Sequence, residues 1–173
     1  DEGGGIWGVG GPSADGNGNM FVVMGNGGNN YAKGGADIGQ AVVRLKESEI
    51  GTTVHYNTGN AFMPKNVQFL NDTDEDLGGG GVVLLPNLIP PVKMPSGPGV
   101  YNGPMIPVWQ LLTTGGKEGK VYLLDRNNLG GIGHSLFEKL YFGNPTVHDL
   151  GEIRAVPAYF ASNGANGSLE HYI

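Results

Sequence analysis

Glycine constrains this chain more than any other residue type. The sequence holds 33 glycines among 173 residues, whereas glycine makes up about 7% of an average protein. Between the glycines lie short apolar runs rich in β-branched and aromatic residues, such as MFVVM, AVVRL, VVLL and VYLL. Because the glycines follow no three-residue period, collagen is excluded, and the apolar runs are typical of strands. We therefore predict an all-β fold of many short strands joined by glycine-rich turns.

The apolar runs fall into two groups of four predicted strands. The first group comprises residues 5–13, 19–25, 39–46 and 50–57, and the second comprises residues 80–86, 107–115, 119–125 and 136–142. Residues 15–18 (DGNG) and 116–119 (GKEG) predict tight hairpin turns, since Gly and Asn accept positive φ. Two further strands are predicted at 153–160 and 168–173, and long loops are predicted at 58–79 and 87–106.

Groups of four sequential strands favour the blades of a β-propeller with four-stranded antiparallel blades. In this interpretation residues 1–173 form part of one propeller domain, with blades at 5–57 and 80–142 and a partial blade at 153–173. Propellers protect their sheet edges by closing into a ring of typically 4–8 blades, and about two and a half blades cannot close. We therefore expect the remainder of a longer chain, or other chains, to complete the ring.

Charge and composition exclude several classes of function. The net charge is −6 and no basic stripe is present, which argues against a nucleic-acid partner. The stretch VVLLPNLIPPV is broken by prolines, so no membrane span is expected. The chain contains no cysteine, which excludes disulfides, thiolate zinc sites and cysteine nucleophiles.

Three stretches together resemble the quinoprotein-like propellers. They are GGIWGVGGPSADGNGNMFVVMGNG, DTDEDLGGGGVVLLP and GGKEGKVYLLDRNNLGG, which between them extend over most of the first three quarters of the chain. Enzymatic members of this family bind pyrroloquinoline quinone (PQQ) and a calcium ion. The resemblance to the PQQ-dependent alcohol dehydrogenases is more distant. It implies an oxidoreductase with an alcohol or sugar as its small-molecule substrate, and a periplasmic or secreted location.

The resemblance assigns four residues of this chain to a cofactor site. Trp7 would lay its ring flat against the quinone, because a tricyclic cofactor needs a wide aromatic face. Asn26 would ligate calcium through its amide oxygen, together with the carboxylate of Asp76. Asp76 would also be the catalytic base that takes the hydroxyl proton of the substrate. Lys117 would contact the quinone oxygens and stabilise the charge that builds on the reduced quinone.

Each of the four residues also has a structural interpretation. Trp7 could pack between blades, and Asn26 could be part of an Asn-Gly turn. Asp76 could belong to a solvated acidic loop, and Lys117 could be a hairpin lysine in water. Two departures from the dehydrogenases favour these alternatives: the disulfide that covers their cofactor has no counterpart here, and Glu75 stands where they carry an aromatic residue.

Two functions therefore remain open. The chain is either part of a PQQ- and calcium-dependent dehydrogenase, or a non-catalytic propeller that binds a partner through the loops 58–79 and 87–106. Geometry separates them, because the cofactor hypothesis requires the four residues to converge. It fails if Asn26 and Asp76 lie more than about 10 Å apart, since calcium–oxygen distances are only about 2.3–2.6 Å.

Overall fold

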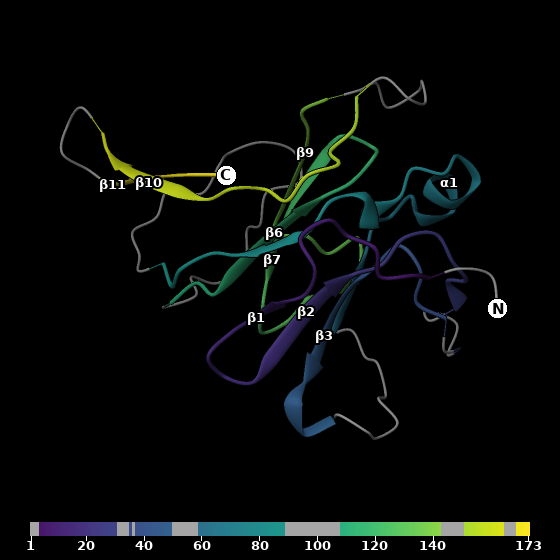
Figure 1. Ribbon diagram of the computed structural model, residues 1–173, viewed down its shortest axis with the longest axis horizontal. Coiled ribbons are helices and arrows are strands. Elements are labelled where there is room, and N and C mark those ends of the chain that lie inside the picture. The colour runs from purple at the N-terminus through teal and green to yellow at the C-terminus, as the bar shows by residue number, and fades with distance from the viewer. Residues whose placement is uncertain are drawn as a thin grey trace.

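The described chain forms two β-sheets and a separate hairpin, joined by turns and irregular segments (Figure 1). The computed structural model describes residues 4–30, 35, 37–49, 59–88, 108–142, 151–164 and 169–173. Within these ranges the α-helical content is one short helix, α1 (Val67–Asp72). No helix in the described part of the chain is long and apolar enough to cross a membrane.

The first sheet has five strands in the order β1-β2-β3-β4-β8. Their bounds are β1 Ser13–Ala14, β2 Asn19–Val23, β3 Val42–Lys46, β4 Ala61–Met63 and β8 Gly131–Ile132. The first four are antiparallel neighbours in chain order, and β8 joins β4 in parallel. The predicted turn between β1 and β2 is confirmed. Asp15 Oδ1 accepts hydrogen bonds from the backbone N–H groups of Asn17 and Asn19, at 2.9 and 3.0 Å.

The second sheet contains four antiparallel strands in chain order. They are β5 (Val82–Leu84), β6 (Leu111–Gly115), β7 (Lys120–Asp125) and β9 (Phe137–Leu140). Each lies inside one of the predicted strands, so the second predicted group is confirmed strand by strand. The predicted turn between β6 and β7 is also confirmed, and Gly119 has a φ of 76° there.

The first predicted group is correct only in part. Of residues 5–13 only Ser13 is in a strand, because the chain passes here over another backbone: a Cβ on Gly8 would lie 2.6 Å from the carbonyl oxygen of Gly80. The predictions 19–25 and 39–46 contain β2 and β3 but are too long, and 50–57 lies outside the described residues.

The prediction of a long loop at 58–79 is wrong, because this segment contains regular structure. It contains β4, α1 and the 3-10 turn η3 (Leu77–Gly79). The strand β4 pairs with β3 and is fully buried, so it takes the fourth position that the sequence had assigned to 50–57. Most of the other predicted loop, 87–106, lies outside the described residues.

The strand predicted at 153–160 is wrong except for its last residue. Ile153 and Val156 pack over glycines at the ends of the sheets: a Cβ on Gly115 would lie 2.9 Å from Ile153 Cδ1, and one on Gly10 would lie 2.3 Å from Val156 Cγ2. This segment therefore crosses the sheets rather than extending along an edge. Strand β10 (Phe160–Asn163) follows it and pairs with β11 (Leu169–Tyr172), which the sequence had predicted.

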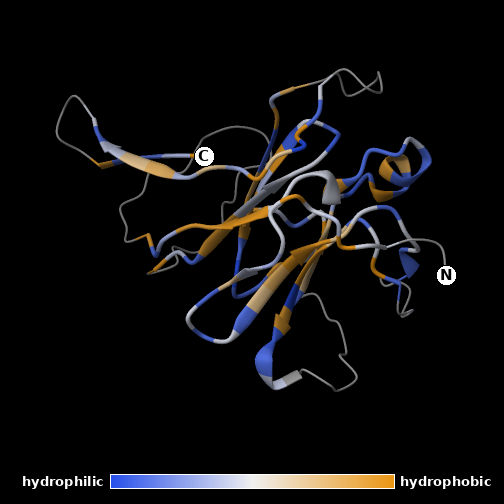
Figure 2. Ribbon diagram, viewed as in Figure 1, coloured by the Kyte–Doolittle hydropathy of each residue, from blue (hydrophilic) through white to orange (hydrophobic). Residues whose placement is uncertain are grey.

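Apolar side chains cover both faces of both sheets. One cluster fills the space between the sheets and includes Phe21, Val42, Phe62, Leu112, Tyr122 and Leu124. The other two lie on the far faces, around Val43 and Met63 on the first sheet and around Trp109 and Leu123 on the second. Figure 2 shows the resulting hydrophobic residues along the strands. Burial on both faces explains why the strand sequences are apolar runs rather than alternating patterns.

In the glycine cluster 78–81, Gly78 and Gly80 lie where their backbone touches the backbone of other segments. A Cβ on Gly78 would lie 2.7 Å from the backbone nitrogen of Gly25, and one on Gly80 would lie 2.0 Å from the carbonyl oxygen of Gly115. Neither position has room for a side chain. Glycine therefore allows the chain after β2, the turn η3 and the end of β6 to meet at one point.

The chain is all-β, as predicted, and its two main sheets are open at their edges within the described residues. Each contains four antiparallel strands whose order in the sheet follows their order in the chain, with β8 of the first sheet inserted between β7 and β9 of the second. Such sheets, buried on both faces, are what the blades of a propeller require. The closed ring, the number of blades and the assignment of the whole chain to one domain remain predictions.

Candidate functional site

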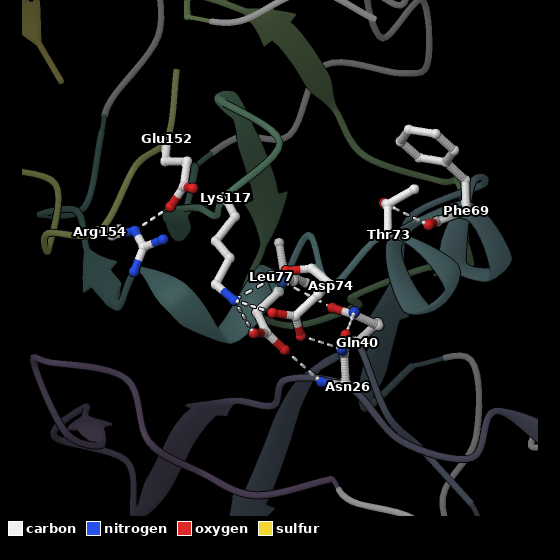
Figure 3. Close-up of polar contacts among 10 residues, drawn as sticks. Asn26, Gln40, Phe69, Thr73, Asp74, Leu77, Lys117, Glu152 and Arg154 are labelled. Atoms are coloured by element: carbon white, nitrogen blue, oxygen red, sulfur yellow. Dashed lines mark hydrogen bonds and ion pairs between the residues drawn. The ribbon is translucent and has the colours of Figure 1, made fainter. Parts of the chain in front are cut away.

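The backbone contact at Gly78 and Gly80 gathers polar side chains from three segments. These segments are the loop 25–27 after β2, residues 74–77 after α1, and the turn 116–119 between β6 and β7 (Figure 3). They carry Asn26, Asp76 and Lys117, three of the four residues that the sequence had singled out.

Asp76 is the buried acid of this site, with its residue only 4% exposed. Its Oδ1 accepts a hydrogen bond of 2.7 Å from the backbone N–H of Asn26, and its Oδ2 lies 2.6 Å from Lys117 Nζ. Its carbonyl oxygen also accepts a bond of 3.0 Å from the backbone N–H of Lys117. The carboxylate is therefore fixed in orientation from both sides, because each oxygen has its own donor.

Lys117 connects the second sheet to this acid. Its ammonium contacts Asp76, and it also donates to Asp74 Oδ2 at 3.0 Å and to the Asp74 carbonyl oxygen at 2.9 Å. Burial alone would lower the pKa of Lys117. The hydrogen bonds and charges of Asp76 and Asp74 outweigh that effect, so the pKa lies above the ordinary value of 10.5. Lys117 is thus a cation in the site and not a lysine in water.

Asn26 is held by its neighbours through its side chain as well. Its Nδ2 donates to Asp74 Oδ1 at 2.7 Å, and its Oδ1 accepts a hydrogen bond from Gln40 Nε2. Gln40 in turn accepts a bond of 2.7 Å from the backbone N–H of Leu77 through its Oε1. This chain of bonds links the loop after β2 to the turn η3. Asn26, Gln40, Asp74, Asp76 and Lys117 are called the Asp76 network below.

Trp7 borders the same site at Gly25. A Cβ on Gly25 would lie 2.2 Å from Trp7 Cζ2 and 2.7 Å from Asp76 Oδ1, so the indole ring and the carboxylate both contact this glycine. The residue is 49% exposed, which argues against a tryptophan packed in the interior between two sheets. One part of the ring therefore packs on the chain while another part remains open to solvent.

The four predicted residues thus converge, and Asn26 and Asp76 are far inside the 10 Å limit. The arrangement fits a proton acceptor beside a cation, with an open aromatic face next to them. It fits calcium less well. The amide oxygen of Asn26 already accepts from Gln40, and Lys117 lies where a cation would approach Asp76. Calcium takes 6–8 oxygens, and the described residues contain no cluster of three or more acidic or histidine side chains placed to hold a metal.

Sequence analysis missed Gln40 and did not assign Asp74 a role. Gln40 is fully buried and has a φ of 52°, a backbone conformation that a residue other than glycine rarely adopts. A single glutamine after a glycine gives no signal of such a role, because its importance comes only from contacts across the fold. Asp74 was visible as one of three neighbouring acids, but its bonds to Lys117 and Asn26 were not.

Comparison of the chain with family models, with curated proteins and with solved structures finds no match. The resemblance to quinoprotein-like propellers therefore rests on the three stretches of sequence alone.

Proposed function

We propose that the Asp76 network and Trp7 form part of the substrate and cofactor site of a quinone-dependent oxidoreductase on a β-propeller. The observation that supports this most is the convergence of Trp7, Asn26, Asp76 and Lys117. These residues come from distant parts of the sequence and are the four that the family resemblance assigns to the cofactor site.

In this proposal Asp76 takes the hydroxyl proton of an alcohol or sugar. Its burial removes competing water, and the N–H of Asn26 holds one oxygen in place while the other faces Lys117. Lys117 supplies positive charge where negative charge develops during the reaction. Trp7 offers the exposed part of its ring as a flat binding surface. PQQ, when bound, is the group that accepts the hydride.

Calcium belongs to the proposal only with a change of partners. Asn26 would have to exchange its hydrogen bond from Gln40 for the metal, and further oxygen ligands would have to come from outside the described residues. The remainder of the ring, supplied by further chain or by other chains, would complete the site. An exported location, periplasmic or secreted, follows from the same resemblance.

The hydrogen bonds and the ion pair within the Asp76 network favour a second function. Each oxygen of Asp76 has a donor, and the amide groups of Asn26 and Gln40 bond to each other and to neighbouring groups. A set of bonds closed in this way stabilises the junction of the two sheets without any ligand. The alternative is therefore a non-catalytic propeller scaffold in which these residues are structural.

Thermal unfolding with PQQ separates the two functions. The protein in its native assembly is heated with PQQ alone, with calcium alone and with both. A ligand that binds only the folded state stabilises it by about 2.7 kcal/mol at a concentration 100-fold above Kd. The oxidoreductase proposal expects a saturable rise in Tm with PQQ, largest when calcium is present.

Two variants make this test specific. Trp7→Ala removes the proposed ring platform and should abolish the shift, whereas Tyr141→Ala removes another exposed aromatic residue, 55% exposed, and should leave it intact. The absence of any PQQ-dependent shift in the unmutated protein would reject the oxidoreductase and favour the scaffold. A shift that survives Trp7→Ala would reject the assigned site.

A further inference from the structure

A polar pocket lies beside the Asp76 network on the side of α1. Its volume is about 380 Å³, and it is lined by the loop 26–29 and by Gln68, Asn71 and Asp72 of α1. This size lies within the range of about 300–1,000 Å³ that small-molecule sites occupy. The pocket and the network share Asn26 and no other residue. We call it the amide pocket.

The lining of the amide pocket differs from that of most small-molecule sites, which are predominantly apolar. Each side chain in the lining is an amide or a carboxylate, and the remaining lining residues are the glycines at 27 and 28. Among the described residues that line the pocket there is no lysine or arginine, and the charged one is Asp72. An apolar ligand would bury amide and carboxylate groups without hydrogen bonds here, and an anion would meet a carboxylate in a protein of net charge −6.

The walls of the pocket are held in place by bonds that leave acceptors open. Asn71 accepts from the backbone N–H of Gly27 at 3.4 Å and donates to its carbonyl oxygen at 2.9 Å, which fixes the loop against the helix. Gln68 Nε2 donates to Asp72 Oδ1 at 2.8 Å. That bond leaves two side-chain oxygens, Asp72 Oδ2 and Gln68 Oε1, as acceptors on the exposed side of α1. Because these walls are already held in place, the protein loses less conformational entropy when a ligand binds.

We propose that the amide pocket binds a neutral polyhydroxylated molecule, namely a sugar or a sugar alcohol. Hydroxyl groups are both donors and acceptors, as amides are, so neighbouring hydroxyls can donate to Asp72 and Gln68 while accepting from an amide N–H. The carboxylate of Asp72 disfavours an anion, and the amides of the lining match the hydroxyl groups of a polyol. This inference does not rest on the quinone: the pocket is formed by α1 and the loop alone, and binding requires no cofactor.

Calorimetric titration without PQQ or calcium tests the inference. The ligands are glucose and sorbitol, with gluconate as the anionic comparator and 1-butanol as the apolar one. Heat of binding is measured rather than Tm, because sugars stabilise proteins nonspecifically as excluded solutes. Saturable heat is expected for glucose or sorbitol, with gluconate and 1-butanol weaker by at least about tenfold, since one charged or desolvated polar group costs that much.

Variants assign the binding to this pocket. Gln68→Ala and Asp72→Ala each remove an exposed side chain from the lining, and each should weaken binding by about threefold to tenfold, the effect of one hydrogen bond. Asn17→Ala removes an exposed amide from the turn between β1 and β2 and should leave binding unchanged.

Three results would overturn the inference. The first is the absence of saturable heat up to about 50 mM sugar, where even a millimolar ligand saturates its site. The second is gluconate or 1-butanol binding as well as sorbitol. The third is sugar binding that neither Gln68→Ala nor Asp72→Ala weakens. A failure here leaves the response to PQQ as a separate result, because that response depends on Trp7 and not on α1.

Discussion

The Asp76 network and the amide pocket share the loop after β2, yet their charged groups differ in burial and in pairing. In the network the side chain of Asp76 is 5% exposed and that of Lys117 is 17% exposed, and the two charges neutralise each other. In the amide pocket Gln68 and Asp72 are exposed and keep acceptors toward solvent. Substitutions in the network should therefore reduce the stability of the fold, and substitutions in the pocket should reduce binding. The predictions below test this division.

The largest expected loss of stability is that of Lys117→Met, because this substitution leaves the Asp76 carboxylate buried without a cation. Removing one partner of a buried pair costs about 3–5 kcal/mol, so we expect a loss near 3 kcal/mol because Lys117 keeps some contact with solvent. Denaturant unfolding measures it. The exposed Lys139→Met on β9 is the matched control and should change stability by less than about 0.5 kcal/mol.

A double variant identifies the cause of that loss. Adding Asp76→Asn to Lys117→Met removes the uncompensated charge, so the pair of changes should be less destabilising than Lys117→Met alone. Equal or greater destabilisation in the double variant would contradict the assignment of a buried charge pair.

A smaller loss is expected for Gly78→Ala. The new methyl group would lie 2.7 Å from the backbone nitrogen of Gly25, and neither backbone can move freely. Overpacking of this kind costs about 1–3 kcal/mol. Gly16→Ala is the control, because a Cβ there meets no atom within 4 Å. If the two variants have the same Tm, the close contact between the segments after β2 and at η3 is not present in solution.

Asn71→Ala should have a moderate effect that links the two regions. It removes both hydrogen bonds between α1 and the backbone of Gly27, for a loss of about 1 kcal/mol. Because it also frees the pocket wall, sugar binding should weaken more than it does in Gln68→Ala. A variant with full stability and full binding would show that the loop holds its shape without α1.

The smallest expected effect is on the pH dependence of stability. The folded-state pKa of Lys117 is raised above its ordinary value of 10.5. Its contribution is therefore complete below that pH, and it is lost as pH rises through the folded-state value. The stability difference between the unmutated protein and Lys117→Met should shrink between pH 9 and alkaline conditions above about pH 11. A difference that stays constant over this range would mean that the ammonium does not stabilise the fold through its charge.

The parts of the fold that the sequence predicted are those with local causes. The turns at 15–18 and 116–119 follow from glycine, asparagine and aspartate, whose side chains or positive φ determine the chain reversal. The strands β5 and β7 follow from the apolar runs VVLL and VYLL, whereas β6 (LLTTG) and β9 (FEKL) lie in stretches that mix apolar with polar residues. By contrast the apolar run of β4 has only the three residues AFM, and α1 has six, too few for either to show a period.

The candidate site was predictable to the extent that motifs name residues. Asn26, Asp76 and Lys117 stand in recognisable stretches, and Asp76 lies within hydrogen-bonding distance of the other two. Gln40 was not predictable, because it acts through Asn26 and Leu77, which are distant from it in the sequence. The role of glycines 78 and 80 was also hidden: the sequence placed Gly78 in the predicted loop 58–79 and Gly80 at the start of the predicted strand 80–86, whereas in the structure both are points of contact between backbones.

The hairpin of β10 and β11 has a consequence for local opening of the chain. Its two strands pair with each other and with no other strand of the described residues, and almost all of their side chains are exposed, Phe160 and Leu169 by 59% and 60%. A two-stranded hairpin is marginally stable in water. Its amide protons should therefore exchange with deuterium through local fraying that requires little free energy. Those of β2, β3, β6 and β7 should exchange only when the sheets unfold as a whole.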